Sequence, residues 1–143
     1  MDHALISEQS IEIAAKASKV WELLTNPEKI KVYLFGTQTE TSWKPGTPIA
    51  FHGSWNGTEY HDKGTVMDYQ EDRLLSYTYW SSMGGMEDKP ENYIRVKFSL
   101  EDEDEQTRLT LTQEGAKNKE ALEHSESNWK TVLEKIKEMA ENE

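Results

Sequence analysis

The segment 118–141 carries the pattern that most restricts how this chain can fold. Its apolar residues recur at steps of three and four among lysines and glutamates, which predicts an amphipathic helix of about six turns. The apolar positions are Leu122, Trp129, Val132, Leu133, Ile136, Met139 and Ala140. Because a helix with one apolar face must bury that face, the rest of the chain has to supply an apolar surface to cover it.

Alternation of apolar and polar residues predicts that this surface is one face of an antiparallel sheet. In the clearest strand, 93–100, every second residue is apolar. Short turns join successive strands, so strands that follow each other should pair antiparallel. The predicted strands are 5–13, 37–43, 49–55, 58–69, 74–80, 93–100 and 107–113. In the last of them we expect Leu109 and Leu111 to point inward and the threonines outward.

Two short helices are expected between the first and second strands. The apolar positions of 14–24 fit one helical face, with Ser18 as the cap. Asn26-Pro27 then restarts a helix, which should end near Gly36. The pattern predicts a single α+β domain, 1–143, in which a curved antiparallel sheet of about six or seven strands packs around the long C-terminal helix.

Composition excludes several classes of function. The chain has no cysteine, which rules out disulfides and thiolate metal sites and fits a cytoplasmic location. Its 16 basic and 27 acidic residues give a net charge of −11, so nucleic acid and anionic membranes are not expected as partners. Neither a signal peptide nor an apolar run long enough to span a membrane is visible. No phosphate-loop, His-Glu-x-x-His or Gly-x-Ser-x-Gly motif occurs, so we predict no cofactor and no catalytic residue.

The Asn56-Gly57 pair predicts a two-residue hairpin turn and thereby the register of the strands that flank it. In that register Trp55 opposes Thr58 and His52 opposes His61. Two imidazoles near Glu59 have the chemistry of a metal site, but they fall on the convex, wet face. We therefore expect a surface pair and no metal.

The same register places Asp62 opposite Phe51 on the concave face, beside Tyr60. A carboxylate there would act as a base or anchor a ligand. A β-bulge before Gly64 would instead turn Asp62 to solvent. Both readings stay open.

Three stretches, which together span most of the chain, resemble one known family. They are IEIAAKASKVWELLTNPEKIKVYLFG, GTVMDYQEDRLLSYTYW and LTLTQEGA with NWKTVLEKIKE. They resemble the START-like, polyketide-cyclase-like superfamily, in the branch of the heat-shock-protein-90 ATPase activator homologues. The resemblance implies a helix-grip fold, in which the sheet and the long C-terminal helix enclose an apolar cavity. Tyr79 stands where that branch usually has Trp, and Asn128 where Gly is commoner.

The resemblance implies a ligand cavity between the concave sheet face and the last helix. Together with the alternation, it nominates as wall residues Phe51, Trp55, Tyr77, Tyr79, Leu122 and Trp129. The nominated residues of the mouth are Phe35, Trp43, Met83 and Met86. Asp62, Tyr77 and Ser125 are candidates for orienting a ligand. The alternative is that these rings simply pack as core.

Three functions remain open from the sequence. The first is a non-enzymatic module that binds a small apolar or aromatic molecule. The second is a co-chaperone of the stress response that stimulates the heat-shock-protein-90 ATPase, although the usual activator has a further N-terminal domain for which 143 residues leave no room. The third is a cyclase- or hydratase-type enzyme that uses Asp62 or a cavity tyrosine as acid or base.

Overall fold

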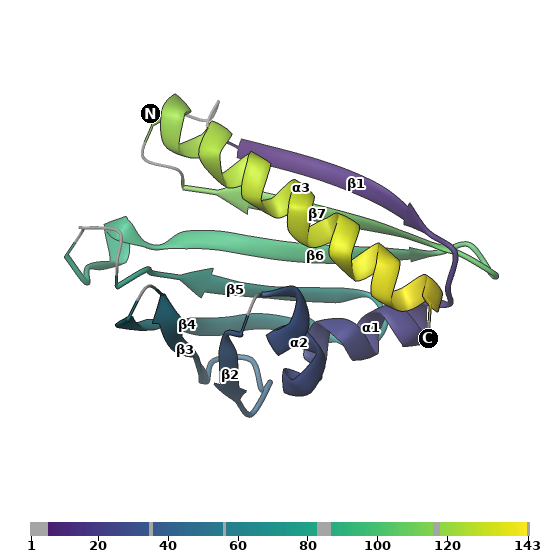
Figure 1. Ribbon diagram of the computed structural model, residues 1–143, viewed down its shortest axis with the longest axis horizontal. Coiled ribbons are helices and arrows are strands. Elements are labelled where there is room, and N and C mark those ends of the chain that lie inside the picture. The colour runs from purple at the N-terminus through teal and green to yellow at the C-terminus, as the bar shows by residue number, and fades with distance from the viewer. Residues whose placement is uncertain (1–5, 35, 56, 83–86, 116–117, 143) are drawn as a thin grey trace.

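In the computed structural model the described residues are 6–34, 36–55, 57–82, 87–115 and 118–142 (Figure 1). The helices are α1 (Ala17–Thr25), α2 (Pro27–Tyr33), α3 (Lys119–Asn142) and the short 3-10 helix η1 (Pro90–Asn92). The strands are β1 (Ile6–Ile13), β2 (Gln38–Thr41), β3 (Pro48–Trp55), β4 (Thr58–Gln70), β5 (Leu74–Tyr79), β6 (Ile94–Asp102) and β7 (Thr107–Glu114).

The strands form one seven-stranded antiparallel sheet in the order β1-β7-β6-β5-β4-β3-β2. Strands β2 to β7 are neighbours in chain order, and β1 pairs with β7 at the far edge. Figure 1 shows α3 crossing one face of the sheet alongside β1 and β7, with α1 beside the C-terminal end of α3 and α2 near β2. The predicted α+β helix-grip fold is therefore confirmed.

The core lies where the apolar stripe of α3 meets the concave face of the sheet. Ile136 of α3 and Leu109 of β7 are fully buried, as is Val20 of α1. The alternation expected for 93–100 holds, because Val96, Phe98 and Leu100 are buried while the residues between them are not. The inward residues of the strands, which recur every second position, and those of the helices, which recur about every 3.6 positions, thus form one contiguous core.

The hairpin register is as predicted. Trp55 pairs with Thr58, His52 with His61, and Phe51 with Asp62. The irregularity in β4 falls between Val66 and Asp68, beyond Gly64. Asp62 therefore keeps its inward orientation and is only 7% exposed.

Two local predictions were wrong. The N-cap of α1 is Lys16, whose side chain makes no capping bond, and Ser18 lies inside the helix. Thr107 points inward, because it is in phase with Leu109 in a strand of period two; its hydroxyl donates to the Ala15 carbonyl at 2.8 Å. By contrast, the Asn26 cap of α2 is confirmed, since its side chain accepts from the Glu28 N–H.

Candidate ligand cavity

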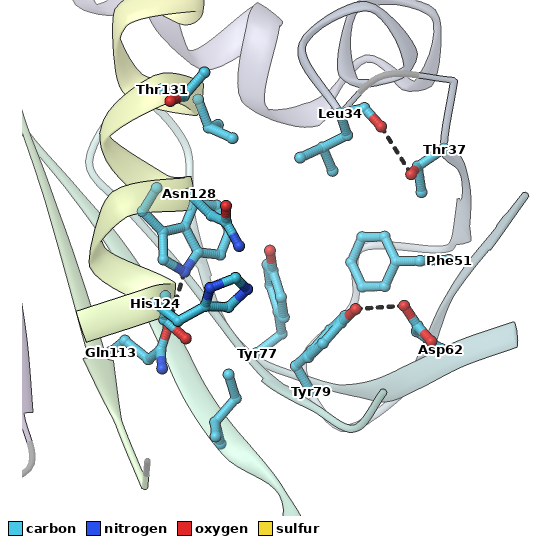
Figure 2. A pocket seen from close by; sticks show the side chains of 14 residues that line it. Leu34, Thr37, Phe51, Asp62, Tyr77, Tyr79, Gln113, His124, Asn128 and Thr131 are labelled. Atoms are coloured by element: carbon cyan, nitrogen blue, oxygen red, sulfur yellow. Dashed lines mark hydrogen bonds between the residues drawn. The ribbon is translucent and has the colours of Figure 1, made fainter. Parts of the chain in front are cut away.

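A cavity of about 650 Å³ lies between the concave sheet face and α3. Strands β3, β4, β5, β6 and β7 form its floor, α3 forms one wall, and the segment after α2 forms the opposite side (Figure 2). Its lining residues are Leu34, Thr37, Phe51, Asp62, Tyr77, Tyr79, Ile94, Gln113, His124, Ser125, Asn128, Trp129, Thr131 and Val132. Half of them are aliphatic or are Phe, Tyr or Trp, and the other half are polar.

Three aromatic rings make a continuous wall on the sheet side. Tyr77 and Tyr79 lie two residues apart on β5 and therefore face the same way. Phe51 reaches both from β3, with ring centroids 5.5 Å from Tyr77 and 5.6 Å from Tyr79. The tilts of 46° and 59° avoid a face-to-face sandwich and leave ring faces available to the cavity.

Asp62 holds this wall in place. One carboxylate oxygen accepts a hydrogen bond from the Tyr79 hydroxyl, as Figure 2 shows. The other accepts from the Ser82 backbone N–H at 2.9 Å and from the Ser82 hydroxyl at 3.1 Å. Because both oxygens already accept bonds from the protein, the arrangement suits an anchor for Tyr79 better than a free general base.

On the helix side, Trp129 is fixed by a buried amide. Its indole N–H donates to the Gln113 side-chain oxygen at 2.8 Å, and its ring stands edge-on to Phe98 at 82°. Because an indole N–H only donates, this bond determines which end of the Gln113 amide faces Trp129. The amide nitrogen of Gln113 is then directed away from Trp129.

The cavity tyrosines stay uncharged at neutral pH. Burial raises the pKa of the Tyr77 hydroxyl well above its ordinary value. Burial, followed by the hydrogen bond to Asp62, does the same to the pKa of Tyr79. The described lining residues include neither lysine nor arginine, and His124 is the one basic side chain among them.

Five of the nominated residues besides Asp62 line the cavity: Phe51, Tyr77, Tyr79, Ser125 and Trp129. Leu122 is buried but does not line it. The ring of Trp43 packs on Tyr69 instead, with centroids 6.0 Å apart. Phe35, Met83, Met86 and the side chain of Trp55 lie outside the described residues.

The lining residues that sequence reasoning missed are Leu34, Thr37, Ile94, Gln113, His124, Asn128, Thr131 and Val132. Two signals were available for part of this set. Gln113 is in phase with Leu109 and Leu111 on β7. His124, Asn128 and Thr131 follow helical spacing along the edge of the apolar stripe of α3.

The histidine pair lies on the opposite face of the sheet. The rings of His52 and His61 are stacked with centroids 6.2 Å apart, and His52 is bonded to Glu40 at 2.6 Å. Within the described part of the chain, no group of three or more His, Asp or Glu side chains is arranged to hold a metal. Nor does any helix there have the length and apolar character needed to cross a membrane.

Solved structures share this architecture. A Cytophaga hutchinsonii protein, known from its solution structure, is 40% identical, with a TM-score of 0.86 over 99% of this chain and 97% of that one. A heat-shock-protein-90 activator from Plasmodium falciparum (17% identity, TM-score 0.72, 94% of each chain) shares the fold. So does CalU16 from Micromonospora echinospora (20% identity, TM-score 0.69, 96% of this chain and 74% of that one).

No curated protein matches the chain significantly. A family model does: the one described as Activator of Hsp90 ATPase homolog 1-like protein matches residues 14–141. That match includes both short helices, strands β2 to β7 and nearly all of α3. The resemblance inferred from the sequence is thereby confirmed, and the chain belongs to the Activator of Hsp90 ATPase homolog 1-like family.

Proposed function

We propose that this protein binds a small, neutral, apolar or aromatic molecule in the cavity between the sheet and α3. The observation that carries the proposal is the cavity itself, with its volume of about 650 Å³ and its wall of aromatic rings. Ligand sites in proteins are typically about 300–1,000 Å³ and mostly apolar with a few polar groups. If the nominated rings only filled the core, no such space would remain.

The lining determines which molecules are suitable. Flat rings stack on Phe51 and Tyr79, and Trp129 closes the opposite side. A ring system that buries ~200 Å² of apolar surface gains about 5 kcal/mol before the costs of association are subtracted. Because 5 kcal/mol alone corresponds to a Kd of about 0.2 mM, we expect an affinity no tighter than this for such a ring system.

Charge also favours neutral ligands. The chain carries a net charge of −11, and the described lining has no lysine or arginine. An anion would lose its hydration without gaining a permanently charged partner, and it would lie near the Asp62 carboxylate. Polar groups at the edge of α3, among them Ser125 and Asn128, are available to orient a neutral molecule.

The test is a screen of neutral aromatic compounds read by backbone amide NMR shifts. We expect shifts to concentrate on Tyr77, Tyr79 and Trp129. A Ser125→Trp substitution, which fills the cavity from α3, should abolish them. Ser127→Trp is the matched control, because Ser127 lies exposed on the same helix and does not line the cavity. Shifts that spread over the convex face, or that survive Ser125→Trp, would contradict the proposal.

The family match favours a second candidate function, which is stimulation of a heat-shock-protein-90 ATPase. Such a role needs a docking surface and does not need the cavity. ATP turnover by the purified chaperone, measured with and without this protein, tests it. Unchanged turnover and no co-precipitation would remove this candidate, whereas stimulation that persists in Ser125→Trp would separate it from ligand binding.

A further inference from the structure

The polar residues on the Phe51 side of the cavity are already bonded within the protein. The Thr37 hydroxyl donates to the Leu34 carbonyl at 2.9 Å and lies 2.6 Å from the Tyr60 hydroxyl. Both carboxylate oxygens of Asp62 accept hydrogen bonds. This side of the cavity therefore offers a ligand mainly aromatic surface.

The unpaired polar groups lie mainly on the opposite side, where α3 covers β7. Figure 2 shows Gln113, His124 and Asn128 on this side, across the cavity from Phe51 and Asp62. Within the described residues, four groups besides the Tyr77 hydroxyl line the cavity and make no hydrogen bond: the imidazole of His124, the hydroxyl of Ser125, the side-chain amide of Asn128 and the amide nitrogen of Gln113. The free hydrogen-bonding capacity of the cavity is thus concentrated on one side.

Gln113 differs from the other members of this group because its hydrogen-bonding role is fixed. Hydroxyls, the asparagine amide and a neutral imidazole can each donate or accept. The Oε1 atom of Gln113 faces Trp129 and accepts its indole N–H at 2.8 Å, so the free end of the amide is Nε2. An amide nitrogen only donates. A group that contacts this end of Gln113 must therefore be an acceptor.

The amide nitrogen is buried and yet reaches open space. Gln113 is only 2% exposed and lies on β7, an interior strand whose concave face is covered by α3. The unpaired side-chain atoms of the described residues that are completely sealed are Trp21 Nε1 and Thr39 Oγ1, and Gln113 Nε2 is not among them. Because Gln113 lines the cavity, the open space beside Nε2 is the cavity itself.

A buried N–H group without a partner costs free energy. Water in the cavity can pair with Gln113 Nε2 while no ligand is bound. A ligand that displaces this water has to reproduce its hydrogen bond, or it loses affinity. The groups that do so without adding a charge are neutral oxygens, and a carbonyl oxygen has no proton of its own to place.

We infer that Gln113 is a specificity-determining residue, whose Nε2 donates to a neutral oxygen acceptor of the ligand. The ligand class is then an aromatic molecule with its rings against Phe51 and Tyr79 and a carbonyl-type oxygen at the end that points toward β7 and α3. This inference rests on the proposed function and adds an orientation to it. Gln113 thereby has two roles, because Oε1 anchors Trp129 and Nε2 binds the ligand.

Two probes of matched shape test this role: 2-acetonaphthone, which has a carbonyl, and 2-isopropenylnaphthalene, in which a CH₂ group replaces the carbonyl oxygen. The preference for the ketone is the Kd of the hydrocarbon divided by the Kd of the ketone. We expect Gln113→Met to lower this preference by ~2- to 12-fold, as loss of one neutral hydrogen bond predicts. Loss of the bond to Trp129 affects both probes and cancels in the ratio. Gln70→Met is the matched control, because Gln70 is exposed at the end of β4 and does not line the cavity.

A second readout does not depend on the variant. In ¹⁵N-labelled wild-type protein, a side-chain amide proton of Gln113 should move downfield when the ketone binds and should move less when the hydrocarbon binds. An unchanged ketone preference in Gln113→Met, or an amide signal that responds equally to both probes, would overturn the role of Gln113 and leave the cavity proposal intact. Failure of both probes to bind would also overturn it, whereas the wider compound screen decides the cavity proposal separately.

Discussion

Replacing Asp62 removes the group that holds Tyr79 in the cavity wall. We consider two substitutions: Asp62→Leu, which removes every acceptor, and Asp62→Asn, which keeps one. Asp62 is 7% exposed and accepts three hydrogen bonds, one from Tyr79 and two from Ser82. The two variants should therefore differ clearly in stability.

The magnitude follows from where each bond lies. Ser82 is exposed, so water replaces its bonds at little cost. The Tyr79 hydroxyl lies in the wall, and in Asp62→Leu it loses a charged acceptor, which should lower the free energy of unfolding by roughly 2–4 kcal/mol. In Asp62→Asn the amide oxygen still faces Ser82 and the amide nitrogen can donate to Tyr79. A neutral bond then replaces a charged one, at a loss of roughly 1–2 kcal/mol.

Urea unfolding followed by tryptophan fluorescence measures both losses. Asp72→Asn is the control, because Asp72 lies in the turn before β5 with a φ of 65°, a conformation that Asn also tolerates. We also expect Asp62→Leu to weaken binding of aromatic probes, since the ring of Tyr79 is no longer anchored. Asp62→Leu as stable as the wild type, or Asp62→Asn as unstable as Asp62→Leu, would refute the reasoning.

Two further predictions concern the sheet and the buried tyrosines. Gly64→Ala should lower the free energy of unfolding by about 3 kcal/mol or more, because a Cβ at Gly64 would lie 1.6 Å from the Thr78 carbonyl oxygen. Gly53→Ala should lower the free energy of unfolding by less, since its Cβ meets only the end of the Tyr60 side chain. A lower urea midpoint for Gly53→Ala than for Gly64→Ala would contradict this. Stability should also fall above pH 10: Tyr33, Tyr77 and Tyr79 have raised pKa values when folded, so only the unfolded chain loses those protons there. The loss is up to ~1.4 kcal/mol per pH unit for each tyrosine. If these three residues gave phenolate absorbance near pH 10 while the protein was still folded, the predicted loss of stability would be wrong.

Local patterns in the sequence predicted the elements and their faces. The period of two on β6 and the period of 3.6 on α3 each follow from backbone geometry within one element. A two-residue turn sets the register of the whole β3–β4 hairpin, so the pairing of Phe51 with Asp62 followed from Asn56-Gly57.

Residues whose role depends on loop conformation were harder to predict. Trp43 was expected at the mouth as part of a strand, but β2 ends at Thr41 and Trp43 has a φ of 65°. Its backbone N–H is held by the Thr41 hydroxyl at 3.0 Å, and its ring turns onto Tyr69. Nothing in the alternation of 37–43 indicates that change of direction.

The amino-acid sequence by itself therefore determined that a sheet grips a helix, and which faces of each are apolar. Tertiary structure alone decided that a space remains between them and that Asp62 anchors Tyr79 and Ser82. The physical reason is that periodicity is a property of neighbouring residues. A cavity is the volume left over when elements distant in the chain pack together, and its size depends on how every one of them is placed.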